Sequence, residues 1–190
     1  AQDWWLQPTG TLEATRGGFD VYCEWSDYGT QRALLISVPM FREFLAPYLK
    51  RIRELGLEGK VTFQPSRPDV QWYYAAADVY VGPSLEDTFA QPPTEAMGCG
   101  LPVITTATNG TAEIMTDGVD GLVLQDPNDV AGLAERIRWL YAHPELRERM
   151  AEQAAITAAQ YTWDRNGVEM RAIFAEALSR KGRSAVPKQA

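Results

Sequence analysis

The sequence predicts an α/β domain in which a parallel sheet is covered by helices on both faces. Short, β-rich apolar runs alternate with longer stretches of helical periodicity, which is typical of a strand–helix repeat. The apolar runs are nearly continuous, as expected for strands that are buried on both sides. The chain has 190 residues, of which 45% are hydrophobic, and this is enough for one domain with its own core.

The first third of the chain is predicted to hold three strands and two helices. Residues 1–32 have the weakest pattern, and we take them as the start of the same domain. They are predicted to contain part of a strand at Trp4, Trp5 and Leu6 and a helix at 19–28. The further predicted elements are a strand at 33–38, a helix whose apolar stripe runs from Phe41 to Leu55 before Gly56, and a strand at 60–63.

A strand–loop–helix–strand unit is predicted at the centre of the chain. A short helix at 70–77 leads into a strand at 77–82, and a second strand follows at 101–105. Two strands joined through a helix form a βαβ unit, and ligands bind such sheets where loops leave the carboxyl ends of the strands. We expect the loop at 106–111, after the second strand, to lie beside the loop that follows the first.

The last third of the chain is predicted to hold a strand at 121–124 and three helices. These helices open at Asp126-Pro127, at Pro144 and at Thr162, because a capping side chain or a first-turn proline marks each start. The third helix carries an apolar stripe of Trp163, Met170, Phe174 and Leu178, and the charges between the stripes are expected to face solvent. The main domain then spans 33–181, and 182–190 is a short basic tail.

Composition argues against several classes of function. The net charge is −7 and no basic cluster is present, so the chain is a poor candidate for binding nucleic acid. No apolar run approaches the roughly 20 residues of a membrane span, and no secretory leader is visible, so we expect a cytoplasmic protein. One histidine and two distant cysteines do not make a metal cluster. We expect Cys99 to be a small buried hydrophobe.

Residues 83–100 are the stretch that points most directly to function. Pro92 and Pro93 have a fixed φ and no N–H to leave unpaired, so they suit a helix opening. Glu95 then lies in the first turn, where the helix dipole favours its charge, and N–H groups at such a start can hold an anion. The preceding loop carries the polar side chains of Asp87, Thr88 and Gln91. Carboxylates can bind hydroxyl groups, and backbone N–H groups can bind phosphate. A nucleotide sugar carries both hydroxyl groups and phosphates, so it suits this stretch.

This stretch resembles the donor-site motif of retaining glycosyltransferases of family 4, which have the GT-B fold. That motif begins with an acidic residue and a Phe-Gly pair, and a second Glu follows the acidic residue after seven intervening residues. Ala-Met and a small-Cys-Gly-Leu-Pro-Val run come next. Here the corresponding residues are Asp87, Phe89, Ala90 and Glu95, followed by Gly98 to Val103. The likeness extends from about residue 34 to residue 178.

The resemblance implies a Rossmann-like domain that is the C-terminal, donor-binding half of a hexosyl-type, retaining glycosyltransferase. It assigns Asp87 to hydroxyls of the transferred sugar and Glu95 to the ribose hydroxyls. It implies that the backbone of Thr88, Phe89, Ala90 and Gln91, together with Arg16, faces the diphosphate. It implies no metal and no cofactor besides the nucleotide-sugar substrate. The acceptor domain would lie outside these 190 residues, so we expect little transfer by this chain alone, and any contact with a membrane would be peripheral and made by that domain.

Four departures from the motif leave alternatives open. Asp87 stands for the commoner Glu, Ala90 for Gly, Thr11 for an Arg that pairs with the diphosphate, and Ser37-Val38-Pro39 for a Gly-rich turn. One alternative is a subunit that needs a separate acceptor-binding chain. Another is a degenerate module that binds a sugar nucleotide without transfer. A sugar-nucleotide epimerase half and an α/β domain with a chance motif complete the set. The sequence does not identify the base, the sugar or the acceptor.

Overall fold

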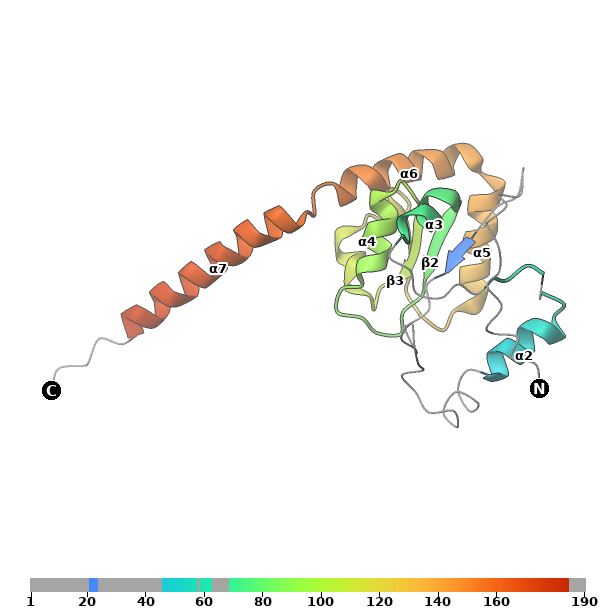
Figure 1. Ribbon diagram of the computed structural model, residues 1–190, viewed down its shortest axis with the longest axis horizontal. Coiled ribbons are helices and arrows are strands. Elements are labelled where there is room, and N and C mark those ends of the chain that lie inside the picture. Colours follow the sequence, from blue (N-terminus) through green and yellow to red (C-terminus); the bar gives the residue numbers. More distant parts are fainter. Residues whose placement is uncertain (1–20, 24–45, 58, 63–68, 185–190) are drawn as a thin grey trace.

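The computed structural model describes residues 21–23, 46–57, 59–62 and 69–184, and it contains a four-stranded parallel sheet (Figure 1). The strands are β1 (Val21–Cys23), β2 (Val79–Gly82), β3 (Val103–Thr106) and β4 (Gly121–Leu124), and they lie side by side in that order. Each neighbouring pair is parallel, with Tyr80 opposite Val103 and Val103 opposite Gly121. The predicted parallel sheet is therefore confirmed.

Helices cover both faces of this sheet. Successive side chains of β2 point to opposite sides, so Tyr80 joins one buried cluster while Val79 and Val81 join the other. The Tyr80 side packs against α3 (Gln71–Ala76), α4 (Gln91–Gly98) and the end of α6 (Pro144–Ala158). The Val79 side packs against α5 (Val130–Ala142) and Met150 of α6. The prediction of two covered faces is confirmed, and α6 contributes to both cores.

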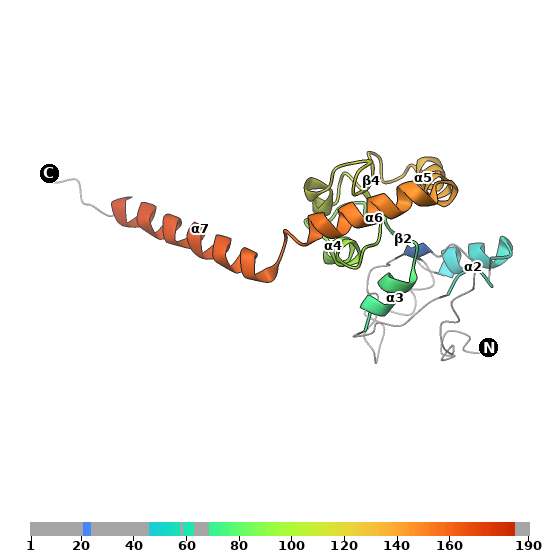
Figure 2. The ribbon, with the colours of Figure 1, turned by 90° about the horizontal axis from the view of Figure 1, so that it is seen from above.

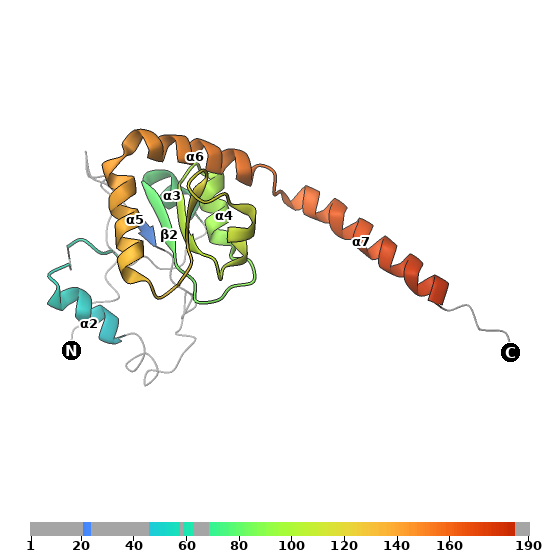
Figure 3. The ribbon, with the colours of Figure 1, turned by 180° about the vertical axis from the view of Figure 1, so that it is seen from behind.

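The last helix, α7 (Trp163–Ser184), leaves this body and extends away from it in all three views (Figures 1, 2 and 3). Thr162 caps it as predicted, because its Oγ1 accepts a hydrogen bond from the Arg165 N–H at 3.2 Å. The apolar stripe of α7 is exposed, from 39% at Met170 to 77% at Trp163. The helix also runs past residue 182, where the sequence predicts a tail, and ends at Ser184.

Three predicted elements differ from the structure. The helix expected to open at Asp126-Pro127 begins at Val130 instead, because Asp129 caps it by accepting a hydrogen bond from the Gly132 N–H at 2.8 Å. A helix was expected at 19–28, but Val21–Cys23 forms a strand, because pairing with β2 supplies backbone partners to residues of good β propensity. A strand was expected at 60–63, but Lys60 and Val61 both donate their N–H groups to the Leu57 carbonyl, at 2.9 and 3.1 Å. These bonds turn the backbone instead of extending it. Phe63 and the predicted strands at 4–6 and 33–38 lie outside the described residues.

The helix predicted before Gly56 is confirmed as α2 (Ala46–Glu54). Gly56 ends it with a positive φ of 67°, a conformation that glycine adopts without steric cost. Its stripe was expected to pack in the core, but Leu55 is 53% exposed. The start of the stripe, at 41–45, lies outside the described residues. Within the described residues, no helix combines the length and the apolar character that crossing a membrane requires.

Candidate functional site

Two loops meet at the carboxyl edge of the sheet. One runs from the end of β2 to α4, and the other runs from the end of β3 to the short 3₁₀ helix η1 (Gly110–Ile114). Their backbones form a parallel bridge between Asp87 and Asn109, in which the Asp87 N–H donates to the Thr108 carbonyl and the Gly110 N–H to the Asp87 carbonyl. The prediction that the loop at 106–111 lies beside the loop before α4 is confirmed.

Threonine hydroxyls at the end of β3 hold the first residues of the loop after β2. The Thr105 hydroxyl donates to the Gly82 carbonyl at 3.1 Å. The hydroxyls of Thr106 and Thr108 both reach the Ser84 carbonyl, at 2.6 and 2.8 Å. Because the bonded residues are 22 to 24 positions apart in sequence, these bonds join separate segments and fix where the loop leaves the sheet.

Asn109 joins three parts of the site through one buried amide. Its side chain is 1% exposed, and its Oδ1 accepts from the N–H groups of Thr111, at 3.0 Å, and Ala90, at 3.3 Å. Its Nδ2 donates to the Ser84 hydroxyl at 3.2 Å. The same amide therefore caps η1, holds the N-cap residue of α4 and anchors the loop after β2.

The Asp87 carboxylate lies on the surface of this loop. Its Oδ1 accepts from the Phe89 N–H at 3.0 Å, which closes a local turn, while its backbone is held by the bridge to Asn109. The side chain of Asp87 is exposed, so its second oxygen faces outward from a fixed backbone. A carboxylate held in this way can accept hydrogen bonds from hydroxyl groups of a ligand.

The start of α4 has fewer free N–H groups than a typical helix start. Ala90 is its N-cap residue, and Pro92 and Pro93 occupy the first turn as predicted. Neither proline has an N–H, and the N–H groups of Phe89 and Ala90 are already bonded within the protein. The backbone donors left at 88–91 for an anion are therefore those of Thr88 and Gln91.

Glu95 was expected in the first turn of the helix, but α4 begins at Gln91, so Glu95 lies in the second turn, from which it projects toward α3. Its Oε2 lies 3.4 Å from the hydroxyl of Tyr74, a long hydrogen bond. Tyr74 is 2% exposed, and its ring meets Tyr80 edge-on at 6.1 Å, so the phenol itself is held firmly. Glu95 is exposed, and one edge of its carboxylate is thus held by the core while the rest faces solvent.

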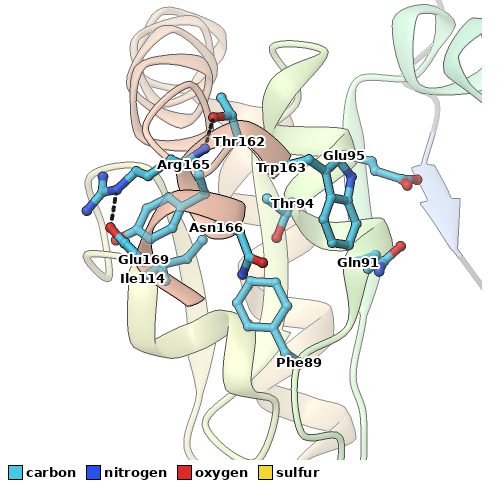
Figure 4. Close-up of a pocket in the computed structure, with 11 residues that line it drawn as sticks. Phe89, Gln91, Thr94, Glu95, Ile114, Thr162, Trp163, Arg165, Asn166 and Glu169 are labelled. Carbon is cyan, nitrogen blue, oxygen red and sulfur yellow. Dashed lines mark hydrogen bonds and ion pairs between the residues drawn. The ribbon is translucent and has the colours of Figure 1, made fainter. Parts of the chain in front are cut away.

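A cavity of about 350 Å³ opens beside Glu95, between α4 and the first turns of α7 (Figure 4). Its lining from the α4 side includes Phe89, Gln91, Thr94 and Glu95. The other wall comes from Ile114, from Tyr161 and Thr162, and from Trp163, Arg165, Asn166 and Glu169 of α7. Three of the predicted site residues, Phe89, Gln91 and Glu95, thus share one cavity.

The remaining predicted site residues do not line this cavity. Asp87, Thr88 and Ala90 lie in the adjoining loop, and Arg16 lies outside the described residues. Sequence reasoning missed the contribution of α7, whose residues carry only an amphipathic pattern. It placed Asn109 in the loop at 106–111 without giving it a role, and the signal for that role was its place after a strand at the same sheet edge. Among the described residues, no three His, Cys, Asp or Glu side chains gather in a way that could hold a metal ion.

The expectation of a buried Cys99 is wrong. Cys99 follows the last residue of α4 and is exposed, because the helix ends there and the chain turns away before Leu101 reenters the core. Partial desolvation raises the pKa of the thiol above its ordinary value, and the negative charge of Glu95 raises it further.

The rate at which Cys99 is alkylated should report on the negative charge of Glu95. A raised pKa leaves less reactive thiolate at pH 8, so we expect iodoacetamide to react more slowly with Cys99 than with a free cysteine. Glu95→Gln removes the carboxylate charge, lowers the pKa and should speed the reaction. The rates are best measured in a Cys23→Ser background, with Glu86→Gln as the matched control that leaves the rate unchanged. Equal rates for Glu95→Gln and its parent would contradict the expectation.

Sequence comparison places the site within a known family of domains. The profile of the family glycosyl transferases group 1 matches residues 43–157. A D-inositol 3-phosphate glycosyltransferase of Frankia alni is 34% identical over 134 residues, which are 69% of this chain and 32% of that protein. A protein of the same name from Thermomonospora curvata is 36% identical over 120 residues, covering 60% of this chain and 27% of that one. The chain therefore spans about a third of the length of the curated relatives it matches.

Two solved structures are similar to this chain in both fold and sequence. Anabaena Alr3699/HepE, crystallised in complex with UDP, superposes with a TM-score of 0.64 at 27% identity, covering 74% of this chain and 38% of that one. WaaG, a glycosyltransferase involved in lipopolysaccharide biosynthesis, superposes with a TM-score of 0.57 at 31% identity, covering 61% of this chain and 31% of that one.

Proposed function

Because this chain belongs to the family glycosyl transferases group 1, we propose that it is the donor-binding part of a retaining, metal-independent glycosyltransferase. Its Rossmann-like sheet is of the kind found in GT-B glycosyltransferases. The proposed donor is a nucleoside-diphosphate sugar, and the sugar passes to an acceptor with its anomeric configuration kept. The observation that carries the proposal is the placement of Asp87 and Glu95 on either side of the start of α4, at the carboxyl edge of a parallel sheet. The UDP complex of Anabaena Alr3699/HepE supports a nucleotide ligand for this type of domain.

The proposed roles follow from the groups that each residue presents. Glu95, steadied by the Tyr74 hydroxyl, accepts hydrogen bonds from the two ribose hydroxyls. Asp87 accepts hydrogen bonds from hydroxyls of the transferred sugar. The N–H groups of Thr88 and Gln91 face the diphosphate, with the cation of Arg16 as the proposed partner.

This chain spans about a third of the length of the curated relatives it matches, and this affects the activity that we expect from it. The proposal places the acceptor site in a further domain, so these 190 residues bind the donor weakly and transfer little by themselves. The further domain is either part of a longer chain or a separate subunit. A cytoplasmic location, with peripheral membrane contact through that domain, belongs to the same proposal.

Calorimetric titration tests the donor site. The chain is titrated with UDP, GDP, ADP and their common sugar conjugates, beside the variants Glu95→Ala and Glu86→Ala. We expect one nucleotide to bind saturably and Glu95→Ala to weaken it about tenfold or more, since a hydrogen bond to a charged group contributes roughly 1.5–3 kcal/mol. Glu86 is an exposed carboxylate of the same loop, and its loss should change little. Binding that is unaffected by Glu95→Ala, or no binding by any nucleotide, would count against the proposal.

A non-catalytic module that binds a sugar nucleotide is the second candidate. It is favoured by the small number of N–H groups left at the start of α4, because the leaving diphosphate would be poorly stabilised. Transfer by the chain joined to an acceptor domain separates the two candidates. Measurable transfer supports the enzyme, whereas tight binding with no turnover supports the module.

A further inference from the structure

We propose that Gly110 and Thr111 are positioning residues, which direct two backbone N–H groups of the neighbouring loop toward the diphosphate of the nucleotide ligand. The two groups are those of Thr88 and Gln91, which have no hydrogen-bond partner within the described part of the chain. This role deepens the proposed function and rests on it, because the diphosphate belongs to the proposed donor. It also explains why these two N–H groups, and not their neighbours, are left for a ligand.

The carbonyl of Asp87 fixes the direction of the first N–H group. It accepts a hydrogen bond from the Gly110 N–H at 2.9 Å, in the bridge between the two loops. The same peptide contains the Thr88 N–H, and in a trans peptide the carbonyl and the N–H point in opposite directions. None of the described peptide bonds is cis. The Thr88 N–H is therefore directed away from Gly110, and Thr88 is an exposed residue.

The carbonyl of Ala90 fixes the direction of the second N–H group in the same way. It accepts a hydrogen bond from the Thr111 hydroxyl at 2.7 Å. Because this carbonyl and the Gln91 N–H share a trans peptide, the Gln91 N–H is directed away from Thr111. Gln91 is also the first residue of α4, where the helix dipole favours an anion. Both N–H groups thus leave the loop on the side opposite residues 109–111.

The peptide between Phe89 and Ala90 has the reverse orientation. Its N–H, which belongs to Ala90, donates to the Asn109 Oδ1 atom at 3.3 Å, so the Phe89 carbonyl is directed away from Asn109. Three consecutive residues, at 109–111, therefore each hold one backbone group of the loop. The groups that face the other side are a donor, an acceptor and a donor, and the acceptor can bind a hydroxyl group of the same ligand.

Glycine and threonine suit these two positions. A Cβ atom on Gly110 would overlap the Thr88 carbonyl oxygen and lie 3.3 Å from the Phe89 Cα atom, so the close approach of the two loops requires glycine. Thr111 is 0% exposed, and its own N–H donates to the Asn109 Oδ1 atom at 3.0 Å, so its hydroxyl is held in a fixed position. Donors that are oriented before the ligand arrives need no reorganisation when it binds.

Two oriented N–H groups distinguish phosphate from the rest of a nucleotide. An N–H group only donates and a phosphate oxygen only accepts, and a hydrogen bond to a charged oxygen is stronger than one to a neutral oxygen. The ribose hydroxyls are assigned to Glu95, whose position does not depend on Thr111. We therefore expect Thr111 to govern the affinity for the diphosphate and to have little effect on the affinity for the nucleoside.

NMR titration of the chain follows the two donors directly. The signals to record are the backbone amides of Thr88 and Gln91, during separate titrations with UDP, uridine and inorganic pyrophosphate. We expect both signals to shift with UDP and with pyrophosphate, and to shift much less with uridine, which has no phosphate.

Thr111→Val removes the hydroxyl at almost constant shape and frees the Ala90 carbonyl. The Gln91 signal should then lose most of its response to UDP, whereas the Thr88 signal, which is oriented through Gly110, should keep its response. We expect the affinity for UDP to fall about fivefold or more, the effect of weakening one charged hydrogen bond, and the affinity for uridine to stay within about twofold of the parent. A general loosening of the loop would reduce both amide responses together.

Three further variants serve as controls. Thr111→Ser keeps the hydroxyl and should keep the affinity for UDP. Thr157→Val removes another threonine hydroxyl, which donates to the Asp120 Oδ2 atom at 2.8 Å on α6, and should leave UDP binding unchanged. Gly110→Ala displaces the Thr88 carbonyl, so the Thr88 signal should lose its response and UDP should bind more weakly. Parental UDP binding by Gly110→Ala would show that Gly110 has no positioning role.

The outcomes separate this role from the donor site itself. If Thr111→Val binds UDP as the parent does, or weakens UDP and uridine by the same factor, the positioning role is wrong and the donor site stands. If UDP does not bind, but pyrophosphate shifts both amides in the parent and only the Thr88 amide in Thr111→Val, the donor site is wrong and the positioning role stands. If neither UDP nor pyrophosphate shifts either amide at about 50 mM, a concentration that would reveal even millimolar affinity, both are wrong.

Discussion

Asn109→Ala is expected to lower the free energy of unfolding by about 2–4 kcal/mol and to weaken nucleotide binding at the proposed site. The substitution removes three hydrogen bonds from a side chain that is 1% exposed. It leaves the N–H groups of Thr111 and Ala90 without their acceptor, and each unpaired buried group costs roughly 1–3 kcal/mol. The loop after β2 also loses the bond from Asn109 to the Ser84 hydroxyl, so Asp87 is held less firmly, by the threonine hydroxyls and the backbone bridge alone. Urea unfolding followed by tryptophan fluorescence measures the first effect, and calorimetry measures the second.

Asn109→Asp is the matched variant for this prediction. It keeps an oxygen that can accept from Thr111 and Ala90 and removes only the donor to the Ser84 hydroxyl, at the cost of burying a charge. We expect its nucleotide affinity to lie between those of the parent and Asn109→Ala. The role assigned to Asn109 would be wrong if Asn109→Ala bound nucleotide as the parent does.

Gly121→Ala is expected to destabilise the sheet by about 2 kcal/mol or more, through overpacking. A Cβ atom at this position would lie 2.7 Å from the carbonyl oxygen of Val103 and would overlap the Met115 side chain. Met115 can move, but Val103 belongs to β3 and is paired in register with Gly121 itself, so its carbonyl cannot retreat without breaking the ladder. Guanidinium unfolding should show a lower midpoint with an unchanged slope.

Gly98→Ala provides the control for the same change elsewhere. Gly98 lies in α4, and a Cβ there would come no closer than 3.9 Å to Ala158. Alanine has the better helix propensity by up to about 1 kcal/mol, so this variant should be as stable as the parent or more stable. If Gly121→Ala and Gly98→Ala had the same unfolding midpoint, a steric clash at position 121 would not explain why this position holds a glycine.

The central βαβ unit could be predicted because its signals are local. The apolar runs at 77–82 and 101–105 have strong β propensity, and Pro92 and Pro93 fix the start of α4 through their own backbone chemistry. Capping by Thr162 and the first-turn Pro144 are local in the same sense, and both helix starts are confirmed.

The errors in prediction arose where backbone pairing or the end of a helix, and not residue composition, decides the outcome. Val21–Cys23 is a strand because β2 lies beside it, and three residues carry too little pattern of their own to reveal that pairing. Lys60 and Val61 resemble a strand in composition, but the carbonyl of Leu57 draws their N–H groups into a turn. Cys99 has the composition of a core position, yet the end of α4 leaves it on the surface.

The α/β class and the central loop and helix could be predicted because they depend on residue type and short-range spacing, and the resemblance to a known motif pointed to Asp87, Phe89, Gln91 and Glu95. The surroundings of these residues depend on tertiary contacts. The buried amide of Asn109 meets Ala90 from 19 residues away, and α7 brings Asn166 and Trp163 to a cavity whose other wall lies some 70 positions earlier in the chain. Such contacts follow from how helices pack on a completed sheet, and no local pattern in the sequence encodes them.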